Sequence, residues 1–182
     1  MAIRSHSQKF TYDVFLNFRG SDTRYGFAGN LYKALDDRGI HTFIDDEKLQ
    51  GGDELAPTLV KAIQESRIAI TVLSHTYASS SFCLDELVYI LERAEEKKLL
   101  VLPVFYNVDP SFVRYQEGSY GEALARHEER LKANNNKEKL EKWKMALHQV
   151  ANFSGFHYKY GYPPHQFFTS FFVSLGFTAP VI

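Results

Sequence analysis

Residues 80–87, with the sequence SSFCLDEL, place a glutamate where a helix is expected to begin. Ser81 is a suitable N-cap, and an apolar stripe at helical spacing follows it: Leu84, Leu87, Val88 and Leu91. Glu86 is expected about one turn inside the helix, near the positive end of the dipole, where a carboxylate is stabilised. A lone glutamate there usually only complements the dipole. The rest of the chain must decide whether Glu86 does chemistry.

The composition is that of a single globular domain. The chain has 182 residues, of which 45% are hydrophobic, enough for one core. Its formal net charge of −1 argues against a nucleic acid or an anionic membrane recruited by bulk charge. Cys83 is the one cysteine, so an internal disulfide is excluded. Residues 1–9 are short, polar and basic and do not resemble a signal peptide.

Apolar bursts alternate with amphipathic segments along the chain. We predict strands at residues 12–18, 41–44, 68–73, 99–106 and 154–158. We predict helices at residues 23–37, 57–66, 82–97, 119–131 and 139–150, with a loop at 109–118. This alternation predicts an α/β fold, a flavodoxin-like three-layer sandwich with a five-stranded parallel sheet in the order 2-1-3-4-5.

Two features are unusual for this fold. Pro103 falls inside a predicted strand, where we expect a bulge or a side without a ladder partner. Residues 159–182 form an apolar tail after the main domain at 1–158, with a phenylalanine stripe that Pro164 could start and Gly176 could end. The apolar run is shorter than the roughly 20 residues of a membrane span. We expect a last helix packed on the sheet; the alternative is an exposed tail.

The predicted sheet brings distant segments to one edge. In such sheets ligands bind outside the carboxyl ends of the strands, at the switch point beside strand 1. Residues 18–24 follow strand 1 and residues 74–86 follow strand 3, so Arg19, Arg24 and Glu86 should share a cleft. Their placement on opposite sides, or a carboxylate sealed under packed side chains, would contradict an enzymatic role.

Other chemical motifs receive less support. Asp45 and Asp46 look like the acidic pair of a response-regulator receiver, but Ser74 and Asn107 stand where that site needs an aspartate and a lysine. The Gly51-Gly52 pair lacks the Lys-Ser/Thr of a phosphate-binding loop. We expect no metal, because three histidines lack ligand spacing: His75, His127 and His148. Cys83 is expected to be a small buried hydrophobe.

Six segments resemble plant TIR (Toll/interleukin-1 receptor) domains, in the order in which that family has them. They are YDVFLNFRGSDTR (12–24), FIDDEKLQGGDEL (43–55), AIQESRIAITVLS (62–74), YASSSFCLDEL (77–87), LPVFYNVDPSFVRYQEGSYGEAL (102–124) and WKMALHQVANFSGFH (143–157). Several long matches in order are far more specific than one short motif. The resemblance covers roughly residues 9–158.

The resemblance implies an NAD nucleosidase of plant innate immunity, active on self-association and expected in the cytoplasm, with the nucleus as an alternative. It implies that Glu86 is catalytic and that NAD or NADP is substrate rather than cofactor. It implies substrate contacts by Arg19, Arg24, Ser80 and Phe82. Phe82 stands where the family often has tryptophan, which keeps an aromatic face but loses the indole donor.

These residue types suit the chemistry. Departure of nicotinamide builds positive charge on the ribose, which a fixed carboxylate can stabilise. One glutamate suffices, because nicotinamide leaves as a neutral group without a general acid. Arg19 and Arg24 could bind pyrophosphate; the alternative for each is a surface ion pair with Asp22 or Asp45, which contributes little.

The family also implies contacts between TIR domains, with like or other TIR chains as partners. From the near-neutral charge and the short apolar run we expect neither nucleic acid nor membrane as a partner. One contact uses the first and last helices, where Gly29 and Asn30 replace a common Ser-His pair. The other uses the loop with Gly51-Gly52 and the region of Gly121, which keep the family pattern. Two further functions stay open: a non-catalytic adaptor, and synthesis of cyclic nucleotides from nucleic acid, which a near-neutral chain does not favour. The sequence does not decide between a TIR-only protein and a receptor fragment.

Overall fold

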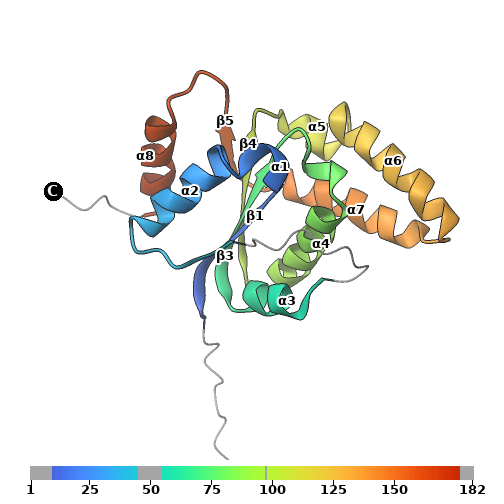
Figure 1. Cartoon of the computed structure of the whole chain (residues 1–182), viewed down its shortest axis with the longest axis horizontal. Coiled ribbons are helices and arrows are strands. Elements are labelled where there is room, and N and C mark those ends of the chain that lie inside the picture. Colours follow the sequence, from blue (N-terminus) through green and yellow to red (C-terminus); the bar gives the residue numbers. More distant parts are fainter. Residues whose placement is uncertain (1–9, 45–54, 97, 177–182) are drawn as a thin grey trace, which may run out of the picture.

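A computed structural model of the chain describes residues 10–44, 55–96 and 98–176. A five-stranded parallel sheet in the order β2-β1-β3-β4-β5 lies at its centre, with helices on both faces (Figure 1). The strands are β1 (Tyr12–Phe18), β2 (Thr42–Ile44), β3 (Ser66–Leu73), β4 (Leu100–Tyr106) and β5 (Phe156–Tyr158). The predicted fold class and strand order are therefore confirmed.

The described helices surround this sheet in two groups. They are α1 (Gly20–Thr23), α2 (Phe27–Asp36), α3 (Pro57–Gln64), the 3₁₀ turn η1 (Tyr77–Ser79), α4 (Ser81–Glu95), α5 (Pro110–Arg114), α6 (Ser119–Ala133), α7 (Lys137–Val150) and α8 (Pro164–Ser174). Helices α2 and α8 cover one face, and α3, α4, α6 and α7 lie on the other side (Figure 1). Within the described residues, every helix is too short or too polar to cross a membrane.

Two hydrophobic cores result, one on each side of the sheet, because successive strand residues point to opposite faces. Val14, Leu16 and Phe18 of β1 pack with α2 and α8, and we call this side the α8 face. Phe15 packs with α3, α4 and α7 on the other side, which we call the α4 face. Asn17 follows the same alternation and points to the α4 face, where its amide meets a side chain of α4.

Two helix predictions were wrong in detail. The helix predicted at 23–37 begins only at Phe27 as α2, because Gly26 before it has φ −126° and ψ −116°, outside the helical region. A separate short helix, α1, occupies residues 20–23, where a turn was expected. The predicted loop at 109–118 contains the short helix α5. Asp109 caps it by accepting a hydrogen bond from the Ser111 N–H at 2.8 Å, and Pro110 occupies the first turn.

Pro103 pairs in register with Thr71 of β3, and the ladder with β5 begins only at the next residue, Val104. On the β5 side the chain approaches at Gly155, where an added Cβ would lie 2.5 Å from the Pro103 carbonyl oxygen. The side without a ladder partner is therefore the β5 side, and close approach there requires a glycine.

The apolar tail forms helix α8, which begins at Pro164 and is followed by Gly176 at φ +76°. Phe167, Phe171 and Phe172 are its buried residues. The Arg38 guanidinium lies 3.8 Å from the Phe172 ring centroid, which ties α8 to the end of α2. The described part of the tail thus belongs to the core of the α8 face.

Candidate functional site

Helix α4 starts at the carboxyl edge of the sheet, and Ser80 sets its first turn. Ser80 has an extended backbone, with φ −99° and ψ 109°, and its hydroxyl accepts a hydrogen bond from the Cys83 N–H at 3.2 Å. The prediction that Ser81 is the N-cap was wrong by one residue, because Ser81 already belongs to the helix. The Ser80 hydroxyl is thus engaged in capping the helix that carries Glu86.

Glu86 is fully buried, with a relative exposure of 0%. Its Oε2 accepts a hydrogen bond of 2.6 Å from the Nδ2 of Asn17, which is also buried at the carboxyl end of β1. Charge-assisted hydrogen bonds of this kind are among the stronger ones in proteins. Sequence reasoning missed Asn17, although the signal was present as a single amide in an apolar strand.

Tyr77 extends this contact into a chain of three side chains. Its hydroxyl lies 2.6 Å from Asn17 Oδ1 and 3.0 Å from the Cys83 carbonyl oxygen. Burial raises the pKa of Tyr77 well above its ordinary value, and the nearby Cys83 and Glu86 raise it further. The hydroxyl therefore stays protonated and donates, which orients the Asn17 amide with its NH₂ group toward Glu86.

The two arginines after β1 lie on different faces. Arg19 comes close enough to His127 of α6, on the α4 face, to contribute to lowering the pKa of that imidazole. The Arg24 guanidinium instead lies 5.5 Å from the ring centroid of Phe18, which belongs to the α8 face. Of the predicted pair, Arg19 is thus the one with an electrostatic effect on a residue of the α4 face.

The remaining predicted residues of this region surround the same helix start. Phe82 is partly buried and packs against the core of the α4 face. Cys83 is buried as expected, and its Sγ donates to the Phe18 carbonyl oxygen at 3.5 Å, which holds α4 against the end of β1. Ser80, Phe82 and Glu86 therefore share the first turns of α4, but the carboxylate is sealed inside. The burial of Glu86 and the position of Arg24 against Phe18 contradict the prediction of one shared cleft, so this conformation is not an open catalytic site.

Helix α6 braces the segment that leads into α4. The Tyr120 hydroxyl donates to the Ser74 carbonyl oxygen at 2.8 Å, and the His127 Nε2–H donates to the Ala78 carbonyl oxygen at 2.9 Å. Burial lowers the pKa of His127 against the opposing effect of that hydrogen bond, and nearby arginines lower it further. A neutral imidazole therefore fixes η1. Among the described residues no group of three or more His, Cys, Asp or Glu side chains is placed to hold a metal.

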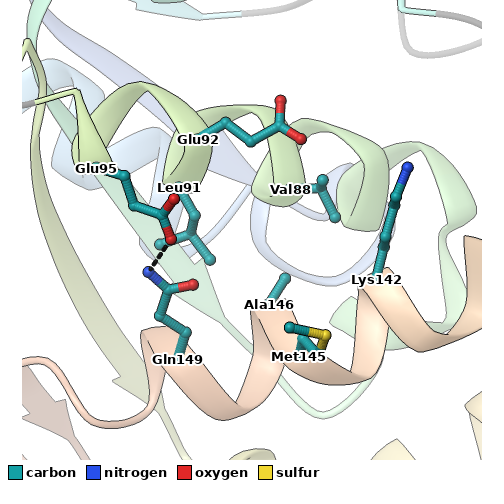
Figure 2. A pocket seen from close by; sticks show the side chains of 8 residues that line it. All are labelled: Val88, Leu91, Glu92, Glu95, Lys142, Met145, Ala146 and Gln149. Carbon is teal, nitrogen blue, oxygen red and sulfur yellow. Dashed lines mark hydrogen bonds between the residues drawn. The ribbon is translucent and has the colours of Figure 1, made fainter.

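A separate shallow pocket lies between α4 and α7, away from the start of α4. Figure 2 shows its apolar floor of Val88, Leu91 and Ala146, with Met145 at its edge. Polar side chains line the rest of it: Glu92, Glu95, Lys142 and Gln149. Gln149 donates to Glu95 across the two helices at 3.3 Å (Figure 2). This pocket contains none of the predicted site residues.

Comparison with known families identifies the fold. The family model described as TIR domain matches residues 11–173, which include β1, α4 and α8. The chain belongs to the TIR domain family.

This TIR domain is similar to plant disease resistance proteins. It is 54% identical to disease resistance protein RPV1 of Vitis rotundifolia over 147 residues, 81% of this chain and 10% of that protein. It is 46% identical to TMV resistance protein N of Nicotiana glutinosa over 155 residues, 85% of this chain and 13% of that protein. The chain therefore spans only about a tenth of the length of these relatives.

A solved structure agrees with this family. It shows the TIR domains of the activated Roq1 resistosome, which is described as directly recognising the pathogen effector XopQ. These domains match this chain with 45% identity and a TM-score of 0.82. The match covers 91% of this chain and 99% of the other.

Two of the glycines predicted at contacts between TIR domains, Gly29 and Gly121, are required by close backbone contacts inside this domain. A Cβ on Gly29 would collide with the Arg24 carbonyl oxygen, and a Cβ on Gly121 would lie 2.5 Å from the Gln116 carbonyl oxygen. Both are places of close backbone approach. Asn30 is exposed on α2. Gly51 and Gly52 lie outside the described residues, as do Asp45 and Asp46.

Proposed function

We propose that this chain is a self-associating signalling domain of plant disease resistance that cleaves NAD between the ribose and nicotinamide. Family membership and the similarity to RPV1, N and the Roq1 TIR domains support the signalling role. One structural observation carries the enzymatic part: a buried carboxylate, Glu86, held at 2.6 Å by Asn17 at the carboxyl edge of the sheet. Ligands of such sheets bind at this edge, and a buried ionisable group there is a candidate functional residue.

The chemistry assigns one task to each group. The C1′–N bond of NAD breaks, its electron pair leaves with neutral nicotinamide, and the ribose acquires oxocarbenium character. The Glu86 carboxylate stabilises that positive charge until water adds to C1′ and loses a proton. Arg19, on the same face, binds the pyrophosphate, and the Phe82 ring lines the site.

Self-association has to make Glu86 accessible. In the single chain the carboxylate has no contact with solvent, so substrate cannot reach it. The proposal therefore requires an open form that neighbouring TIR domains favour, in which α4 or the end of β1 shifts enough to expose Glu86. NAD and NADP are both compatible with this chemistry.

The second candidate is a non-catalytic module that signals only through contact between TIR domains. The observation in its favour is the burial of Glu86, since a fully enclosed carboxylate bonded to Asn17 can serve as a polar element of the core. This candidate predicts no nicotinamide release at any protein concentration.

Substitution of Glu86 separates the two candidates. Glu86→Gln keeps an oxygen that accepts from Asn17 but removes the charge, so we expect nicotinamide release from NAD to fall by about a hundredfold or more. Asp85→Asn is the matched control, because Asp85 binds Trp143 Nε1 at 2.8 Å and Lys139 Nζ at 3.0 Å on the outside of α4. It should leave the rate within about a factor of three, the scale of a surface effect.

The assay is chromatographic quantification of nicotinamide and its nucleotide product, with circular dichroism and light scattering to check folding and association. Equal activity of Glu86→Gln and wild type would remove the catalytic assignment. Loss of activity in both variants would point to damage of α4 rather than to chemistry.

A further inference from the structure

The buried contacts around Glu86 join three elements that surround the candidate site. Asn17 comes from β1, Tyr77 from η1 and Glu86 from α4, and all three side chains have 0% exposure. The two links between them are both 2.6 Å long. Residues 60 and 69 positions apart in the sequence are thus bound side chain to side chain.

The donors and acceptors along these hydrogen bonds can be assigned. The one proton of the Tyr77 hydroxyl is shared between two acceptors, Asn17 Oδ1 at 2.6 Å and the Cys83 carbonyl oxygen at 3.0 Å. That leaves the Asn17 NH₂ group facing the carboxylate of Glu86. The reverse orientation would set two oxygens against each other. Tyr77 therefore acts on Glu86 through Asn17.

We propose that Tyr77 and Asn17 form a latch that holds the Glu86 carboxylate inside the single TIR domain, and that NAD cleavage requires the latch to open. This inference rests on the proposed function and names how the same site is regulated. Contacts between TIR domains that move η1 or the start of α4 relative to β1 would break the link between Asn17 and Glu86.

The energetics favour a switch over a permanent core contact. A carboxylate taken out of water loses its hydration, and opening returns that hydration while it breaks the bond to Asn17. Because these terms oppose one another, loss of the hydrogen bond from Asn17 shifts the balance toward the open form. Loss of a hydrogen bond to a charged group shifts such an equilibrium by about ten- to a hundredfold, and loss of one between neutral groups by about two- to tenfold.

Chemical labelling of Glu86 tests the latch without reference to activity. Dilute full-length protein is treated with a water-soluble carbodiimide and an amine, and labelling of the peptide that contains Glu86 is followed by mass spectrometry. We expect slow labelling of wild type, labelling about two- to tenfold faster for Tyr77→Phe, and about ten- to a hundredfold faster for Asn17→Ala.

Tyr120→Phe is the matched control. Tyr120 is equally buried, and its hydroxyl also bonds a backbone carbonyl, but that carbonyl belongs to Ser74, at 2.8 Å, after the end of β3. Labelling of Glu86 in Tyr120→Phe should match wild type. Equal acceleration in Tyr77→Phe and Tyr120→Phe would show general loosening and overturn the latch. Unchanged labelling in Tyr77→Phe would overturn it as well.

Nicotinamide release from NAD, measured against protein concentration, then connects the latch to the proposed function. Tyr77→Phe should reach half-maximal activity at a concentration about two- to tenfold lower than wild type, while Tyr120→Phe should not. A lower activity of Tyr77→Phe at every concentration would overturn the regulatory role. Faster labelling with no nicotinamide release from any variant, wild type included, would reject the proposed function while the closed contact itself would stand.

Discussion

The two faces of the sheet are built from the same strands but filled with different chemistry. On the α8 face, aromatic rings meet ring against ring: Phe27 lies 4.9 Å from Tyr158 and 5.5 Å from Phe167 between centroids. On the α4 face, at the end of β1, the alternation places Asn17 against Glu86 and Tyr77. A polar chain of this kind is absent from the described core of the α8 face.

The apolar packing of the α8 face is explained by stability, whereas the buried polar contact of the α4 face is not. Apolar side chains on the α8 face stabilise the fold by burial alone. Burial of Glu86 gains little net stability, because the loss of hydration opposes the hydrogen bond from Asn17. A group that contributes little to stability at the edge where sheets of this type bind ligands is more easily explained by chemistry or regulation. Substitutions on the two faces should therefore have different signatures.

The largest expected effect on stability is on the α8 face. Phe171 of α8 has 0% exposure, so Phe171→Ala should lower the free energy of unfolding by about 3–5 kcal/mol through lost burial and a residual cavity. Val173 on the same helix is 67% exposed, and Val173→Ala should change the free energy of unfolding by less than about 0.5 kcal/mol. Urea unfolding followed by circular dichroism measures both. Equal losses would mean that α8 is not anchored through its buried stripe.

A smaller loss of unfolding free energy is expected on the α4 face, and a second substitution should restore most of it. Asn17→Leu leaves the Glu86 carboxylate buried without its amide donor, which should cost about 2–3 kcal/mol of unfolding free energy. Replacing both partners, as Asn17→Leu with Glu86→Leu, should recover most of it, because no charge is then left in the core. A double variant as unstable as the sum of the single ones would show that the polar contact is a true stabiliser.

The smallest effect is a pH dependence from His127. Because burial lowers the pKa of His127 below its ordinary value of 6.5, the unfolded chain binds the proton first, and folding stability falls as pH drops through that value. His127→Gln keeps a donor for the Ala78 carbonyl but cannot titrate. The melting temperature of wild type relative to this variant should decrease between about pH 7.5 and pH 5.5. A difference in melting temperature that stays constant or rises as the pH is lowered would contradict a lowered pKa of His127.

The fold was largely predictable because its determinants are local. Apolar runs flanked by turns located β1, β3 and β4, and their alternation with helices fixed the strand order. The break at Gly26 was not visible, since an isolated glycine is tolerated inside a helical pattern. Helix α5 could have been found from the Asp109-Pro110 pair, which combines an N-cap with a proline in the first turn.

The site was predictable only in part. The position of Glu86 near the start of a helix follows from sequence, and so does the edge of the sheet at which it lies. Its burial does not, because it depends on how α4 docks on β1. The link to Asn17 joins residues 69 positions apart, and the separation of Arg24 from Arg19 depends on the short helix α1 that turns the chain between them. These are tertiary properties that a pattern in one segment cannot encode.

Nicotinamide release per molecule of wild-type protein, measured across the concentration range in which light scattering detects association, tests the central claim most directly. The account predicts a rate near zero for the single chain, with Glu86 enclosed, and a steep rise as TIR domains associate. A rate that stays at zero throughout, or one that is the same for the single chain and the assembly, would contradict it.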